Sequence, residues 1–139
     1  MRRLLIATMV LSFAAAMAGP ADPAVVSADL YYYGWDVTTR VKLSPDDVRR
    51  DPRIVITVLD PARAAALHSW LALPEMVPVK PDRTGSARLV LDFTTGRGET
   101  ITFYASRNEL FSGDSSLVRA IDSEFRDRFR FGEEGSLGQ

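Results

Sequence analysis

The sequence predicts an α+β fold in which one mostly antiparallel sheet of about four strands carries two longer helices on one face, as a two-layer sandwich. The main observation is a predicted hairpin. Residues 87–93 and 100–106 alternate apolar and polar side chains, which is the period of a half-buried strand, and Gly96 and Gly98 lie in the turn between them. Because the second face of this hairpin is polar, we expect helices to cover the other face only.

The hairpin also predicts its own register, because residues opposite each other in an antiparallel pair point to the same face of the sheet. The pairs that keep the apolar side chains together are Phe93 with Ile101, Leu91 with Phe103 and Leu89 with Ala105. The same register places Val90 beside Tyr104 and Asp92 beside Thr102. We expect this second face to be exposed to solvent.

Before the hairpin, the pattern predicts two strands and a short helix. Residues 31–43 carry apolar side chains mainly at odd positions and predict a long strand that bends at Gly34. Ser44 followed by Pro45 is typical of a helix start, since serine caps the first amides and proline suits the first helical position. Residues 53–59 are almost continuously apolar, which favours a central strand buried on both faces.

A longer helix is predicted to begin at Asp60 and Pro61 and to continue to about Leu73, where the next proline ends it. A right-handed crossover through this helix would make the strand before it a parallel neighbour of the first hairpin strand. Residues 75–86 are rich in proline and predict a long irregular connection, which in a compact domain is usually either functional or mobile.

After the hairpin, residues 107–113 predict a loop, and residues 116–130 predict a final helix with Asp114 or Ser115 as its cap. Its apolar positions recur at helical spacing. Residues 132–139 are expected to form a disordered tail.

The N-terminus has the three parts of a secretory signal peptide, which we assign to residues 1–18. Two arginines precede an apolar run over residues 4–16, and Ala18 ends a small-residue cleavage site. The run is shorter than the ~20 apolar residues that span a bilayer, so we expect no transmembrane helix in the mature chain. Residues 19–27 are expected to be an extended lead-in, and residues 28–131 a single domain.

Composition and charge indicate a periplasmic or secreted protein that depends on its core alone. The chain has no cysteine and therefore no disulfide framework. Its formal net charge is -1, and loss of Arg2 and Arg3 with the signal peptide would make it more negative. We therefore do not expect nucleic acid as a partner.

Catalytic and metal-binding patterns are weak. Residues 113–117 have the sequence Gly-Asp-Ser-Ser-Leu and resemble the nucleophile block of the GDSL-type serine hydrolases, which would make Ser115 a nucleophile. That family takes its base from a histidine late in the chain, whereas the one histidine here is His68. We interpret Ser115 as a helix cap and His68 as a structural residue. One histidine without any cysteine does not make a zinc site, and no cofactor is expected.

The predicted binding site is the polar face of the sheet. Tyr32, Arg40, Arg88, Asp92 and Tyr104 are expected on that face, and tyrosine and arginine are enriched in protein interfaces. The sequence thus favours a small exported, non-enzymatic binding or inhibitory module whose partner is another protein of the cell envelope or exterior. Two alternatives stay open. One is an envelope-polymer hydrolase that uses carboxylates such as Asp36 or Asp92, and the other is an envelope-assembly or structural factor.

Overall fold

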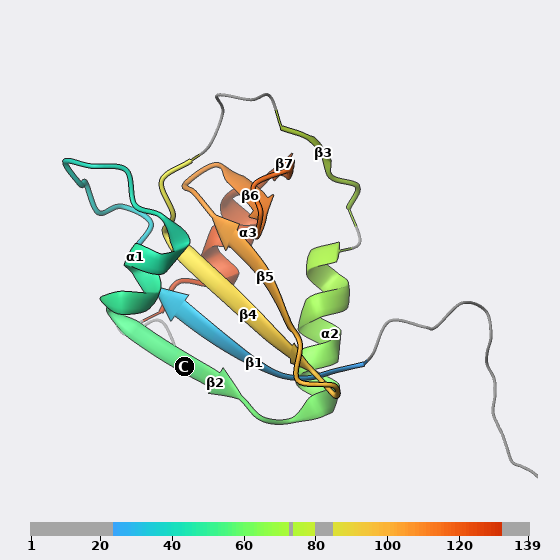
Figure 1. The fold of residues 1–139 in the computed structure, drawn as a ribbon. Helices are drawn as coiled ribbons and strands as arrows, with labels where there is room; N and C mark the ends of the chain where they lie inside the picture. The colour runs from blue at the N-terminus through green and yellow to red at the C-terminus, as the bar shows by residue number, and fades with distance from the viewer. Residues whose placement is uncertain (1–23, 73, 80–84, 132–139) are drawn as a thin grey trace, which may run out of the picture.

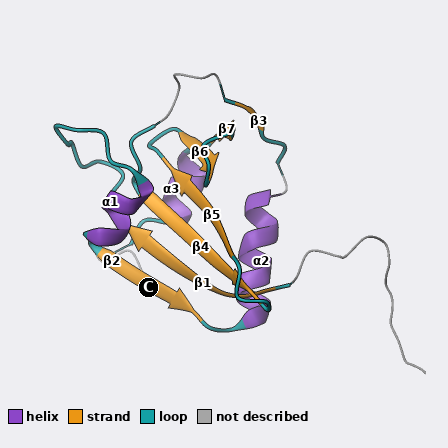
Figure 2. Ribbon diagram, viewed as in Figure 1, coloured by secondary structure: helices purple, strands orange, loops and turns teal. Residues whose placement is uncertain are grey.

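A computed structural model describes residues 24–72, 74–79 and 85–131 (Figure 1). The chain forms one seven-stranded sheet with the strand order β2-β1-β4-β5-β6-β7-β3, and every pair of neighbours is antiparallel. The strands are β1 (Val25–Tyr32), β2 (Ile54–Val58), β3 (Val77–Pro78), β4 (Leu89–Thr95), β5 (Thr100–Ala105), β6 (Glu109–Ser112) and β7 (Leu117–Ala120). The helices are α1 (Pro45–Arg50), α2 (Pro61–Ala72) and α3 (Ser123–Arg128), as Figure 2 shows.

The α+β class is confirmed, but the predicted architecture of about four strands with two longer helices on one face is wrong. The sheet has seven strands, and the helices in the described residues are short, the longest of them being α2 with 12 residues. None of the helices in the described part of the chain is long and apolar enough to cross a membrane. The expected signal peptide (residues 1–18), Leu73 and the expected tail (residues 132–139) lie outside the described residues.

The predicted hairpin and its register are confirmed. β4 and β5 pair with Phe93 opposite Ile101, Leu91 opposite Phe103 and Leu89 opposite Ala105. Gly98 in the connecting turn has a φ of 83°, a conformation that glycine adopts without the steric cost of a side chain. The alternation of apolar residues was sufficient here because one face of the hairpin is buried in the main core, which excludes a one-residue slip.

The predicted helix starts are confirmed where a capping residue is followed by proline, at Ser44 and at Asp60. The side chain of Ser44 accepts a hydrogen bond from the Asp47 amide, and the Asp47 carboxylate accepts one from the Ser44 amide. This reciprocal capping box precedes Pro45 at the start of α1. At α2, the carboxylate of Asp60 accepts a hydrogen bond from the Ala62 amide.

The predicted strand over residues 31–43 is wrong in both its extent and its facing. β1 already begins at Val25, inside the expected lead-in, and ends at Tyr32. Tyr32 points into the main core and Tyr31 packs on the opposite face, the reverse of the predicted alternation. Gly34 then takes a φ of 129°, and after this turn Trp35 joins Tyr32 in the main core.

β2 is an edge strand and not the predicted central one. It pairs only with β1 among the described strands, and its exposed positions include Val55, which is 50% exposed. β2 and β4 do run parallel, since both are antiparallel to β1, but β1 lies between them. The continuous β-branched run in β2 therefore reflects strand propensity and not burial on both faces.

The predicted final helix is mostly wrong. Residues that we expected to be helical form β7, which pairs with β6 through Phe111 opposite Val118. The segment predicted as a loop before it contains β6. α3 begins only at Ser123, where Asp122 is the cap and accepts a hydrogen bond from the Phe125 amide. Apolar spacing fitted a helix across residues 117–129, but partners distant in sequence decided the first part.

Apolar side chains are buried on both faces of the sheet, so the two-layer prediction fails. The main core contains Leu71 of α2 and Phe125 of α3. In Figure 1 these two helices lie behind the sheet. A second core on the other face contains Val48 of α1, Ala87, Val90, Tyr104, Phe111 and Val118. α1 and the segments beside it thus cover the face that was expected to be exposed to solvent.

Candidate functional site

The five residues of the predicted binding site do not share one exposed face. Tyr32 and Tyr104 are 1% and 2% exposed and belong to opposite cores. Arg88 is 8% exposed, at the start of β4. Arg40 is exposed in the connection between β1 and α1, and Asp92 is half-buried. These five positions therefore do not form a flat sheet surface. Two of them lie at different pockets: Arg88 lines one, and Asp92 is bonded to Arg49 and Thr102, which line another.

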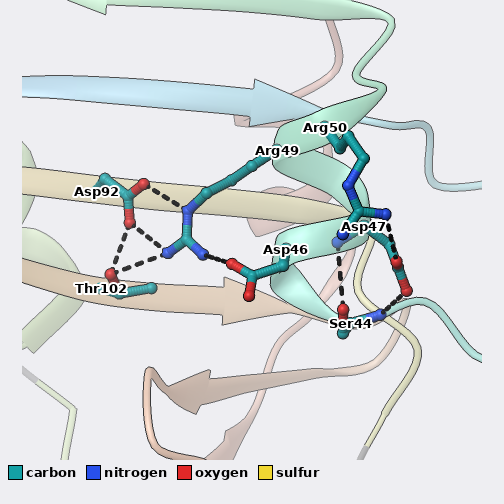
Figure 3. A network of polar contacts seen from close by, with 7 residues as sticks. All are labelled: Ser44, Asp46, Asp47, Arg49, Arg50, Asp92 and Thr102. Atoms are coloured by element: carbon teal, nitrogen blue, oxygen red, sulfur yellow. Dashed lines mark hydrogen bonds and ion pairs between the residues drawn. The ribbon is translucent and has the colours of Figure 1, made fainter.

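Asp92 is held in a network that fastens α1 to the sheet (Figure 3). Arg49 of α1 reaches across β4, and its Nε and Nη2 lie 2.7 and 2.8 Å from the two carboxylate oxygens of Asp92. Thr102 of β5 donates to Asp92 Oδ1 at 2.6 Å. The remaining Nη1 of Arg49 forms an ion pair with Asp46 at 2.6 Å. This two-pronged arrangement is the strongest geometry that an arginine and a carboxylate adopt.

The network keeps both of its main members ionised. Burial alone would raise the pKa of Asp92, but the hydrogen bonds from Arg49 and Thr102 outweigh it, and the pKa lies below its usual value. The hydrogen bond to Asp92 in turn raises the pKa of Arg49. A carboxyl group with a lowered pKa holds no proton to donate near neutral pH, so this geometry gives no support to Asp92 as a general acid. Asp36, the other carboxylate of that hypothesis, contacts Arg130 instead.

A cleft of about 880 Å³ opens beside this network. Its walls are the start of α1, the end of α2 with residues 74–76, the first half of β5 and the turn between β6 and β7. β6 pairs with β5 only at residues 103–105, whereas residues 100–102 pair with β4 alone. The cleft thus lies where one edge of β5 has no neighbouring strand among the described residues.

The cleft combines an apolar floor with carboxylates. Ile101, Phe103, Met76 and Leu117 contribute apolar surface. Among the described residues, three carboxylates line it, those of Asp46, Glu75 and Asp114, and Arg49 is the one basic lining residue. The charge of this described lining is therefore negative.

Asp114 is the carboxylate whose ionisation the structure favours most. Hydrogen bonds from the Ser116 hydroxyl and amide, and one from the Ser112 hydroxyl, lower the pKa of Asp114 to about 2. All three bonds end on Oδ1, at 2.6, 3.0 and 2.8 Å. Oδ2 accepts none of them and is free to accept from a ligand.

The two residues weighed for catalysis have other positions. Ser115 is not a helix cap: it lies in the turn between β6 and β7 with a φ of 62°, and its hydroxyl is 2.5 Å from the Tyr104 hydroxyl. The ring of His68 packs edge-on against Phe93, with ring centroids 5.1 Å apart. His68 and Ser115 thus belong to opposite faces of the sheet. The described residues contain no group of three or more side chains that could hold a metal ion.

The cleft was not predicted from the sequence, because its walls come from four segments that are separate in the chain. The signal that could have indicated it is the proline-rich connection of residues 75–86, whose length is typical of a functional or mobile loop and which supplies Glu75 and Met76. Comparison with known proteins adds no relative, since no protein-family model, curated protein or solved structure matches the chain.

Proposed function

We propose that this protein is a small exported binding module that holds an extended segment of a partner polypeptide in the cleft beside β5. The observation that carries this proposal is the coincidence of a large cleft with a strand edge that no described strand pairs with on that side. An extended peptide can add to such an edge through main-chain hydrogen bonds, while pockets beside the edge select its side chains. Large clefts with an apolar lining and a few polar groups are the usual binding sites of proteins.

The chemistry of the cleft specifies the kind of segment. The one lining arginine, Arg49, is already occupied by Asp92 and Asp46. Glu75 and Asp114 are exposed and face a ligand without a cation of the protein within ion-pair distance among the described residues. The partner segment should therefore carry lysine or arginine next to apolar side chains, the latter packing on Ile101 and Phe103.

Selection from a library of random peptides tests the proposal directly. We expect the bound peptides to be enriched in basic residues flanked by apolar ones. The double substitution Glu75→Gln and Asp114→Asn should weaken the selected peptides by about tenfold, because it removes two charges that accept hydrogen bonds. Glu124→Gln on α3, an exposed carboxylate outside the cleft, is the matched control. Enrichment of acidic peptides, or equal binding by the double variant and wild type, would contradict the proposal.

Export is part of the proposal and has its own test. The signal peptide pattern predicts cleavage after Ala18, so the mature chain should begin at Gly19. Expression of the whole chain in a bacterial host, followed by fractionation and intact mass measurement, checks this. A product that keeps Met1 and stays in the cytoplasm would be evidence against export.

A further inference from the structure

Arg88 is a buried cation without an acidic partner among the described residues. Its side chain lies under the connection between β1 and α1 and is 8% exposed. Nη1 donates to the Ser86 hydroxyl at 2.9 Å and to the Ala87 carbonyl at 3.3 Å. Nε is enclosed and has no acceptor. Among the described residues no carboxylate lies within ion-pair distance of this guanidinium.

The surroundings of Arg88 disfavour its charged form, which lowers its pKa. Burial lowers the pKa of Arg88, and the positive charge of Arg107 lowers it further. Burying a charge is unfavourable unless it is paired, and natural proteins almost always supply the partner. Here a second arginine is nearby instead of an acid. The arrangement is therefore incomplete with respect to charge.

Arg88 lines a separate hollow of about 340 Å³. The seven described residues that line this pocket all have polar side chains, two of them are arginine, and none of the seven is acidic. The pocket lies between the connection after β1, the segment leading into β4 and the turn between β5 and β6. It shares no lining residue with the acidic cleft.

The donors of the pocket are held in place by the backbone around them. The hydroxyl of Ser86 accepts from the Leu43 amide and from Arg88 Nη1, so its own proton is available to a ligand. Arg107 is anchored through Nε, which donates to the Trp35 carbonyl at 3.0 Å, and its two terminal nitrogens donate to no other described residue. Thr38 and Asn108 add further polar side chains.

We propose that the pocket formed by Arg88, Arg107 and Ser86 binds a small oxyanion, a phosphate or carboxylate group of a ligand. An oxyanion would place a negative charge beside both arginines. It would also accept hydrogen bonds from the Ser86 hydroxyl and from the terminal nitrogens of Arg107. Arginine suits such a group because its planar donors match the oxygen spacing of both carboxylate and phosphate. The site shares no described lining residue with the proposed peptide cleft, so a test of oxyanion binding does not depend on whether the cleft binds a peptide.

Melting and titration of the mature protein test this site with two simple probes. Sodium phosphate and sodium acetate are each compared with sodium chloride at the same ionic strength and pH. We expect at least one of the two probes to raise the melting temperature of the wild type, because a ligand of the folded state stabilises it. The probe with the larger shift identifies the class of oxyanion.

The variant Arg88→Met tests whether Arg88 binds a ligand or serves only the structure of the protein. This variant keeps much of the side-chain volume but removes the unpaired charge, so it should melt above the wild type without any probe. It should also weaken oxyanion binding by at least about tenfold. Arg107→Gln, on the exposed side of the pocket, should weaken binding several-fold and provides a test that does not depend on the folding of Arg88→Met.

The matched control is Arg63→Gln on α2, an exposed arginine outside the pocket, which should bind the probe like the wild type. Two results would overturn the site. One is a wild type that responds to neither phosphate nor acetate beyond the chloride response. The other is a response that persists undiminished in both Arg88→Met and Arg107→Gln.

Discussion

Replacing Trp35 with alanine is expected to cost about 3–5 kcal/mol of the free energy of unfolding, the largest effect of any single substitution proposed for this chain. The side chain is fully buried. Its ring makes edge contacts with Tyr32 and Phe125, and its Nε1 donates to the Arg126 carbonyl at 3.0 Å. Trp35 therefore joins the connection after β1 to α3, and its loss leaves both a cavity and a carbonyl without its donor.

Urea unfolding of Trp35→Ala beside two comparison variants measures this effect. Trp35→Phe keeps an aromatic ring but removes the donor to Arg126, and should cost about 1–3 kcal/mol. Trp70→Ala removes a tryptophan of α2 that is only partly buried, and should cost less than Trp35→Ala. Equal losses from the two tryptophans would mean that Trp35 does not hold α3 against the sheet.

Tyr104→Ala is expected to cost about 3–4 kcal/mol, close to the cost of Phe103→Ala on the opposite face of β5. Tyr104 is 2% exposed, its ring is stacked on Phe111 with centroids 5.0 Å apart, and its hydroxyl contacts Ser115. The sequence pattern predicts instead that Tyr104 lies on a face exposed to solvent. The second core makes the two residues of comparable importance.

The same denaturation measurement distinguishes the two descriptions of the sheet. Tyr104→Phe retains the stacked ring and should lose only about 1 kcal/mol, the usual net contribution of one hydrogen bond. Tyr104→Ala with a midpoint near that of the wild type, beside a strongly destabilised Phe103→Ala, would show that the second face of the sheet is not packed.

The candidate sites could be predicted only in part, because each is completed by a residue distant in the sequence. Asp92 and Arg88 were singled out as polar residues on a strand. Asp92 finds its partner in Arg49, 43 positions earlier, which converts a presumed surface carboxylate into a fixed ion pair. Arg88 has no acidic partner in the part of the chain that the structure describes, and its nearest charge is Arg107, which the sequence pattern did not place beside it.

The helix starts could be predicted from the sequence because their causes are local. α1 and α2 followed from caps at Ser44 and Asp60 with proline next to them, and the interacting groups lie within a few residues, so each helix start is favoured before any tertiary contact forms. The hairpin of β4 and β5 followed from alternation across a glycine turn, and its register was predictable because one apolar set of side chains has to face the main core.

Contacts between distant segments set the edge position of β2, the strand character of residues 117–120 and the burial of the second sheet face. An apolar run has the same sequence whether one or both of its faces are covered, and apolar residues at helical spacing can also pair as a strand when a neighbour such as β6 is present. The packing of α1 over Val90 and Tyr104 is a contact between segments far apart in the chain. Its free energy comes from apolar surface that both segments remove from water together, so neither segment alone encodes it.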